Sequence, residues 1–205
     1  MRVTKFLGVN LDEKLAWNEH INGLCSKIAR SIGVINKLNF LPSRILRNLY
    51  FTLLHSHLNY CNIIWASSNL TNLRRLHKLQ KKAVRIICNL PFNAHTSLLF
   101  QSLKILSIFD MYKLNTACYM YSCHRKLLPS PLRKYFAVNS DKHVQHTRRN
   151  DDFYVPFSRT SVSQRSLAFS GPKLWNSLPL SLKNAPSLQS FKKNYKHYLF
   201  QTYGN

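Results

Sequence analysis

Apolar residues recur at helical spacing along most of this chain. Residues 17–38 have an apolar side chain at roughly every third or fourth position, a stripe that predicts an amphipathic helix of about six turns. The same pattern predicts a second helix over residues 43–58, a third over residues 71–90 and a further long helix within residues 103–127. The apolar run at residues 59–65 fits either a helix or a strand, because periodicity does not separate the two in so short a segment.

The two ends of the chain have different patterns. Residues 3–11 predict one short strand that leads through a glycine into an Asn/Asp turn, with no earlier segment for it to pair with. Residues 137–163 are polar and predict a linker with at most one short strand. Beyond them we expect a short helix at residues 164–169, a helix with Pro172 at its first position, and a last helix that Ser187 caps.

The predicted fold is mainly α, with a strand or hairpin remnant at its N-terminus, and it has four parts. A strand and turn occupy residues 1–13, a helical bundle residues 14–136, the polar linker residues 137–163, and a smaller helical segment residues 164–205. With 205 residues and 45% apolar content, the chain is long enough to bury a core. It has no run of about 18 apolar residues and no signal-peptide pattern, so we expect an intracellular protein, nuclear or cytoplasmic and not secreted.

Positive charge dominates the composition. The chain has 30 Lys and Arg against 7 Asp and Glu, a net charge of +23, which favours a polyanionic partner, nucleic acid before a membrane. Between Glu19 and Asp110 there is no carboxylate, while the same stretch holds 12 Lys and Arg. We therefore expect a partner outside this stretch to neutralise these cations.

The helix predicted over residues 71–90 separates its charges from its apolar residues. At about 100° per residue, its Leu, Val and Ile residues fall on one side and six cations on the other. These cations are Arg74, Arg75, Lys78, Lys81, Lys82 and Arg85. Like charges at i,i+4 cost about 0.2–0.5 kcal/mol per pair, so a face without one acid favours phosphate contact. A solvated face, a membrane surface or a partner protein fits the same pattern.

The last predicted helix has a smaller basic cluster. Lys192, Lys193 and Lys196 largely avoid its apolar stripe, and Tyr195 and Tyr198 lie among them. Aromatic side chains among cations are typical of single-strand binding, whereas core packing is the ordinary role of an aromatic on an apolar stripe. We include the three lysines among the candidate nucleic-acid-binding residues.

No catalytic or metal site is predicted. The five cysteines are odd in number and scattered, which favours reduced core thiols, and the Cys and His residues near Cys61 and Cys123 lack a Cys-x2-Cys spacing for zinc. Asp151 and Asp152 are the one adjacent acidic pair, and a solvated loop pair or a partner for nearby arginines explains them better than catalysis. No cofactor is expected.

Five blocks, in order, resemble the C-terminal part of non-LTR (LINE, jockey-like) retrotransposon reverse transcriptases. They are FLGVNLDEKLAWNEHI (6–21), LYFTLLHSHLNYCNIIW (49–65), LHKLQKKAVRIIC (76–88), HTRRNDDFYVP (146–156) and GPKLWNSLP (171–179). The resemblance covers nearly the whole chain. It implies that the N-terminal strand is a palm-edge remnant that pairs with the polymerase palm, and that residues 14–136 resemble the thumb, which packs against the primer–template duplex. It leaves the role of the Trp-Asn-Ser-Leu-Pro segment undefined.

The resemblance also implies what this chain lacks. Polymerisation needs carboxylates that hold two metal ions, and in that family they lie in a Tyr-x-Asp-Asp turn and on a preceding strand, neither of which is in this sequence. We therefore expect a non-catalytic C-terminal fragment of an RNA-directed DNA polymerase. It would bind the phosphates of an RNA–DNA hybrid or duplex non-specifically through its basic helix face. Magnesium is expected only in the missing palm.

Two other interpretations stay open at this point. A domesticated, stand-alone nucleic-acid- or protein-binding module would have the same charge but would fold cooperatively alone. A fragment should instead expose Phe6, Leu7 and Val9 at its N-terminus. An enzyme with an unrecognised acid or thiol site is the third interpretation.

Overall fold

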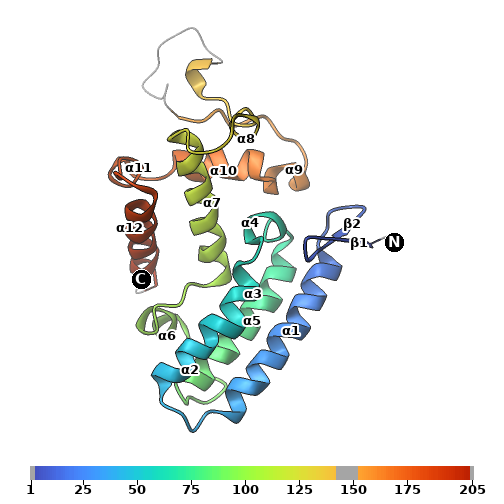
Figure 1. The fold of residues 1–205 in the computed structure, drawn as a ribbon, viewed down its shortest axis with the longest axis vertical. Helices are drawn as coiled ribbons and strands as arrows, with labels where there is room; N and C mark the ends of the chain where they lie inside the picture. The colour runs from blue at the N-terminus through green and yellow to red at the C-terminus, as the bar shows by residue number, and fades with distance from the viewer. Residues whose placement is uncertain (1–2, 142–151, 204–205) are drawn as a thin grey trace. The chain divides into compact units, whose positions relative to one another are not determined.

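The computed structural model describes residues 3–141 and 152–203, and within them the fold is mainly α, as predicted (Figure 1). The chain divides into two compact units. The first comprises Met1–Met111 and Phe200–Asn205, and the second comprises Tyr112–Leu199. Each unit is described by itself below, and the predicted division into four parts stays a prediction.

The N-terminal segment is a hairpin, which confirms the predicted strand or hairpin remnant, and the apolar run at residues 3–11 forms two strands and not one. Strand β1 (Val3–Phe6) pairs antiparallel with β2 (Val9–Asp12). The two turn residues, Leu7 and Gly8, have φ values of 45° and 81°, as a primed two-residue turn requires. Gly8 adopts this left-handed conformation without strain, and the strand therefore folds back on itself.

The hairpin is attached to the first helix. The buried Asp12 carboxylate accepts hydrogen bonds from the backbone N–H groups of Lys14, Ala16 and Trp17, at 3.1, 2.9 and 2.7 Å. It satisfies backbone donors at the point where the chain enters α1 (Asn18–Lys37). The Asn10 N–H also donates to His20 of α1 at 3.4 Å, and the Tyr60 hydroxyl donates to the Leu7 carbonyl at 2.6 Å, so the hairpin is held by several contacts.

The exposure of the hairpin only partly matches the expectation for a fragment. Phe6 and Leu7 are exposed, with 63% and 73% of their surface accessible, as predicted. Val9 is 5% exposed, so its predicted exposure was wrong. The reason is the turn at Gly8, because it lays β2 along α1 and buries the inward side chains of that strand.

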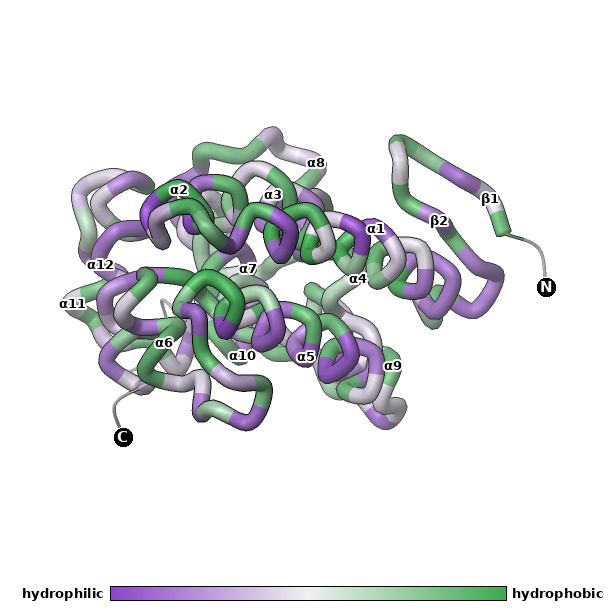
Figure 2. The backbone as a smooth tube through the Cα atoms, turned by 90° about the horizontal axis from the view of Figure 1, so that it is seen from below, coloured by the Kyte–Doolittle hydropathy of each residue, from purple (hydrophilic) through white to green (hydrophobic). Residues whose placement is uncertain are grey.

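Helices α1 and α5 (Leu70–Ile87) lie side by side in the first unit and form the centre of its core (Figure 1). Ile21, Ile28 and Ile35 of α1 are fully buried, at the seven-residue spacing that the sequence indicated. Figure 2 shows the polar and apolar residues alternating along both helices. The predicted helices over residues 17–38 and 71–90 are thus confirmed, within a few residues at each end.

The helix predicted over residues 43–58 is present as three consecutive pieces. They are α2 (Ser43–Tyr50), the π-helical η1 (Phe51–His55) and α3 (Ser56–Asn59). The run for which helix and strand stayed open is helical, as α4 (Asn62–Trp65). It begins after Cys61, whose φ of 49° breaks the preceding helix. Trp65 is fully buried and donates its indole N–H to the Tyr60 carbonyl at 2.7 Å.

A buried polar cluster closes the first unit. Helix α6 (Ser97–Ser102) is followed by α7 (Ile108–His124), and the Ser107 hydroxyl before α7 donates to Asp110 at 2.6 Å. Tyr203, near the C-terminus, donates to the same carboxylate at 2.5 Å. The Ser107 hydroxyl also accepts from the Asp110 N–H at 3.2 Å, and the Ser107 N–H donates to the Tyr203 hydroxyl at 2.9 Å, so Ser107 and Tyr203 together satisfy backbone donors at the start of α7.

After the part of α7 that begins at Tyr112, the second unit continues with short helices and a long last one. They are α8 (Ser130–Arg133), the 3-10 turn η2 (Asn139–Asp141), α9 (Ser161–Arg165), α10 (Leu167–Asn176), α11 (Leu180–Lys183) and α12 (Leu188–Gln201). Ser187 accepts from the Ser190 N–H at 3.1 Å, which confirms it as the cap of α12. Pro172 lies inside α10, so its predicted place at the start of a helix was wrong. The helix begins at Leu167 because Ser166 interrupts α9 before it.

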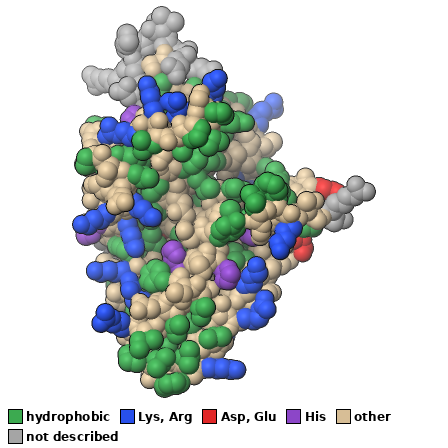
Figure 3. Space-filling view, viewed as in Figure 1, with side chains coloured by type: hydrophobic (Ala, Val, Ile, Leu, Met, Phe, Trp, Pro, Cys, Tyr) green, Lys and Arg blue, Asp and Glu red, His purple; other side chains and the backbone are tan. Residues whose placement is uncertain are grey.

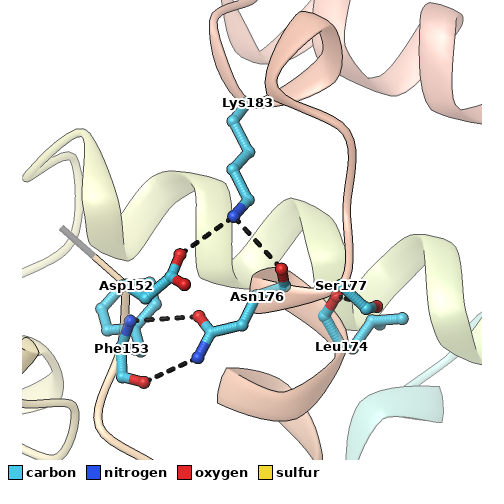
Figure 4. Close-up of polar contacts among 6 residues, drawn as sticks. All are labelled: Asp152, Phe153, Leu174, Asn176, Ser177 and Lys183. Carbon is cyan, nitrogen blue, oxygen red and sulfur yellow. Dashed lines mark hydrogen bonds and ion pairs between the residues drawn. The ribbon is translucent and has the colours of Figure 1, made fainter. Parts of the chain in front are cut away.

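The GPKLWNSLP block forms the centre of the second unit. The Asn176 side chain accepts from the Phe153 N–H at 3.1 Å and donates to the Phe153 carbonyl at 2.8 Å, as a neighbouring strand would (Figure 4). Lys183 donates to Asp152 at 3.1 Å and to the Asn176 carbonyl at 3.4 Å. We call these four residues the Asn176 clamp. It joins the end of the HTRRNDDFYVP block to the GPKLWNSLP block.

Aromatic rings pack beneath the clamp. Trp175 is 1% exposed, and its ring centroid lies 5.3 Å from His124, 5.9 Å from Phe191 and 6.2 Å from Phe153. These separations are in the range of favourable aromatic contacts. The tryptophan of the block is therefore a core residue of the second unit.

Candidate nucleic-acid interface

Helix α5 presents its six predicted cations on the face opposite its buried residues. Asn69 caps the helix by accepting from the Asn72 N–H at 2.9 Å. The apolar face, which includes Leu76, Ala83 and Val84, is fully buried. The cations are placed as follows: Arg74, Arg75, Lys78 and Lys82 are exposed, and Lys81 and Arg85 are half-buried.

The α5 cations find neutral partners, not acidic ones. Arg75 donates to the side-chain oxygen of Asn22 at 2.9 Å, and the Arg85 guanidinium donates to the Ala94 carbonyl at 2.9 Å. Within the described residues, none of the six has a carboxylate partner. On the face drawn in Figure 3, Lys and Arg side chains far outnumber Asp and Glu.

The positive charge of α5 affects the pKa of a half-buried histidine on the same helix, His77. Burial and then the positive charge of Lys81 lower the pKa of His77, against smaller opposing effects of Gln80 and Asp110. The imidazole lies against Phe100 and Phe109, with ring centroids 5.6 and 5.3 Å away. His77 is therefore neutral at pH 7 and does not add to the cationic face.

A groove of about 720 Å³ runs along the C-terminal half of α5. One wall comes from α1 and includes Gly33, and the other carries Lys78, Lys82 and Arg85. Phe92, in the loop after α5, also lines it and is 89% exposed. We call this feature the α1/α5 groove. Neither Gly33 nor Phe92 was singled out from the sequence, where an aromatic in the Pro-Phe-Asn turn after the basic helix was the available signal.

The second basic cluster lies on α12, in the second unit. Lys192 and Lys193 are exposed and Lys196 is half-buried, on a surface that also includes Gln189. Tyr195 is 2% exposed, so it is a core residue. Tyr198 is 42% exposed, and its ring stacks on Tyr195 at 6.1 Å between centroids.

The described thiols are free, and burial limits the reactivity of four of them. It raises the pKa of Cys25, Cys88 and Cys123, and raises that of Cys118 to about 11 against the opposing charge of Lys192. Thiols with raised pKa values are poor nucleophiles at neutral pH. Among residues 3–141 and 152–203, no three His, Cys, Asp or Glu side chains are grouped so that they could hold a metal ion.

The acidic pair of the linker is only partly described. Asp151 lies outside the described residues, as do the arginines before it. Asp152 forms an ion pair with Lys183 at 3.1 Å, and both side chains are largely buried. Asp152 is therefore paired and largely buried, so it is not a solvated loop residue.

Two curated proteins of Drosophila melanogaster are similar to this chain. The RNA-directed DNA polymerase from mobile element jockey is 27% identical over 151 residues, which are 71% of this chain and 16% of that protein. The probable RNA-directed DNA polymerase from transposon X-element is 24% identical over 136 residues, which are 63% of this chain and 15% of that protein. The predicted resemblance to retrotransposon reverse transcriptases is confirmed.

The similarity is limited to a small part of these relatives. The chain spans 15% of the X-element protein and 16% of the jockey protein, so the similarity concerns a small region of each relative. No family model and no solved structure matches the chain. In the described part of the chain, no helix is long and apolar enough to cross a membrane.

Proposed function

We propose that this chain is a non-catalytic, nucleic-acid-contacting region of a retrotransposon RNA-directed DNA polymerase, and that the α5 face is its contact surface. The observation that carries the proposal is the row of α5 cations without a carboxylate partner among the described residues. The printed names of both relatives, which are RNA-directed DNA polymerases, support it.

The dimensions of the α5 face suit a phosphate backbone. From Arg74 to Arg85 the helix rises about 16 Å, at about 1.5 Å per residue. Phosphates of one strand rise about 3.4 Å each along a duplex and also wind around its axis, so a straight row of this length can reach a few of them. Exposed cations neutralise phosphates regardless of base sequence, so the contact would position nucleic acid without reading it.

The carboxylates of the described residues support the non-catalytic part of the proposal. Asp12 accepts three backbone N–H groups, Asp110 accepts from Ser107 and Tyr203, and Asp152 pairs with Lys183. Each of these acids therefore has a structural partner within its own unit. Two-metal catalysis would require such acids to converge on one open site.

The hairpin suggests where a further part of the polymerase would pack. All four residues of β1 are exposed, and Phe6 and Leu7 present apolar side chains at the turn. An exposed strand edge with apolar side chains is a ready surface for pairing with another segment. We propose that a palm domain of the longer protein covers it.

The test is fluorescence anisotropy with a labelled RNA–DNA hybrid at several salt concentrations. Log affinity should fall by about 0.9 per log unit of salt for each phosphate that the protein neutralises. Arg74, Lys78 and Lys82 are all exposed, so we would change all three to alanine. The variant should bind about tenfold more weakly at low salt, and its salt slope should be smaller by about 2–3. Arg85 is left unchanged because it holds the loop at Ala94.

A charge-matched control separates the α5 face from net charge. Lys14, Arg44 and Lys104 are exposed cations of the first unit that do not lie on α5. Changing these three to alanine removes the same total charge and should alter the affinity by less than about threefold. Equal losses in both triple variants, or an affinity that does not depend on salt, would contradict the α5 face as the contact surface.

A further inference from the structure

The α1/α5 groove has two chemically different walls. The α5 wall carries four cations, Lys78, Lys81, Lys82 and Arg85, whereas α1 contributes no charged residue to it. No Asp or Glu is among the described residues that line it. A ligand that fits both walls has an anionic edge and an uncharged body.

Small residues on the α1 wall leave the groove open. Ala29 and Gly33 lie one helical turn apart on α1, and both line the groove. A Cβ atom built on Gly33 meets no atom within 4 Å. The volume of about 720 Å³ lies in the range of about 300–1,000 Å³ that is typical of ligand-binding clefts.

Phe92 is an exposed aromatic side chain on a fixed loop. The loop leaves α5 through Asn89, whose φ of 50° allows the Leu90 N–H to bond back to the Arg85 carbonyl at 3.0 Å. Arg85 also donates to the Ala94 carbonyl, so the loop is fixed on both sides of Phe92. A ring that is 89% exposed, on a loop whose backbone is held at the edge of a groove, is suited to stacking on a planar ligand.

We propose that the α1/α5 groove holds unpaired nucleotides, with their bases against the α1 wall and Phe92 and their phosphates on the α5 cations. The inference rests on the proposed function, because the same cations take part in both. It adds a preference: the region would bind single strands more tightly than duplex.

Charge and base accessibility decide between the possible occupants. In a duplex the base faces are stacked on one another, so only the α5 cations would be used and the groove would stay empty. An acidic amphipathic helix would also complement the cations. However, the cation row continues past the groove to Arg74 and Arg75, which favours a longer polyanion.

The decisive variant fills the groove without disturbing the helix. Gly33→Leu places a side chain in open space on α1, and leucine is a better helix former than glycine. Gly23→Leu is the matched control, because Gly23 lies on the same helix, is exposed, has equally open surroundings and does not line the groove. Phe92→Ala is the second variant, with Phe40→Ala as its control, since Phe40 is 76% exposed and lies outside the groove.

Anisotropy of each variant is measured with a labelled oligo(dT) and with an RNA–DNA hybrid, each about 12 nucleotides long. We expect Gly33→Leu and Phe92→Ala to weaken oligo(dT) binding about five- to tenfold and hybrid binding less than about twofold. The control variants should bind both probes as the parent chain does. Thermal unfolding by circular dichroism should show that every variant is folded.

The outcomes distinguish failure of this inference from failure of the proposed function. If both groove variants bind oligo(dT) like the parent, while the Arg74/Lys78/Lys82 variant is weakened, the groove inference is wrong and the α5 contact stands. If the parent binds neither probe, both proposals are wrong. If a labelled acidic helical peptide binds and Gly33→Leu abolishes its binding while oligo(dT) is unaffected, the groove is a protein-docking site instead.

Discussion

The α5 face in the first unit and the Asn176 clamp in the second unit contain blocks that resemble the same polymerase family, yet they use their polar groups in opposite ways. On α5, Arg74, Lys78 and Lys82 have no partner among the described residues. In the clamp, Asn176 makes two hydrogen bonds to Phe153, and Lys183 makes one to Asp152 and one to the Asn176 carbonyl. A matching block therefore does not by itself mark a contact surface.

The difference lies in how each region satisfies its polar groups. A buried polar group without a partner costs free energy, so buried groups that remain are paired, as in the clamp. Exposed cations are hydrated by water and remain available to bind an anion. The partners of the polar side chains thus separate a structural joint from a candidate interface, and this distinction can be tested at both sites.

The largest effect is expected from Trp175→Ala. The side chain is 1% exposed and contacts several rings, so its removal leaves a large cavity in the second unit. We expect a loss of about 3–5 kcal/mol in the free energy of unfolding, measured by urea titration of circular dichroism. Leu180→Ala, at a position that is 72% exposed, is the control and should change the value by less than about 0.5 kcal/mol. A loss of less than about 1 kcal/mol for Trp175→Ala would contradict a structural role for the block.

A smaller effect is expected from Asn176→Ala. The substitution leaves the Phe153 N–H and carbonyl without their partner, which should cost about 1–3 kcal/mol in the free energy of unfolding. Asn194→Ala, an exposed position on α12, is the matched control. At a temperature where the Asn176 variant is folded, its affinity for the RNA–DNA hybrid should equal that of the parent. A weakened affinity at full stability would instead make the clamp part of the interface.

Local patterns explain which parts of the fold could be predicted. The boundaries of α1 and α5 follow from apolar periodicity, and the Ser187 cap follows from its position before α12. The sequence left a strand and a hairpin open at the N-terminus, because the two strands read as one apolar segment and the turn between them depends on the positive φ of Leu7 and Gly8. Pro172 was misplaced because a proline is typical of a helix start, whereas the chain accommodates this one within α10.

The candidate site also has one part that follows from local sequence patterns and another that depends on long-range contacts. The cationic face of α5 is a property of one helix, so the sequence predicts it in full. The α1/α5 groove depends on which residues of α1 face α5, and that pairing brings Gly33 and Phe92 together from positions far apart in the chain. The Asn176 clamp likewise joins Asp152 and Phe153 to a helix that begins at Leu167. Contacts of this kind have no signature in a single sequence.

The smallest predicted effect concerns the titration of His77. Burial and the charge of Lys81 lower its pKa below 6.5, so the neutral form is favoured in the folded state. The unfolded chain therefore takes up the proton first, and this residue's contribution to stability is complete above about pH 6.5 and is lost as the pH falls toward the folded pKa. Lys81→Ala should raise the pKa of His77, as measured from the pH dependence of its NMR ring signals.

Nucleic-acid binding should act in the same direction as that substitution. Phosphates on the α5 face would offset the charge of Lys81, so a saturating RNA–DNA hybrid should also raise the pKa of His77. His20 is the internal control, because burial and Lys27, which is not on α5, lower its pKa. An equal change at both histidines would indicate a general charge effect. A change confined to His77 would place the bound phosphates at α5 and not at the hydrogen-bonded clamp of the second unit.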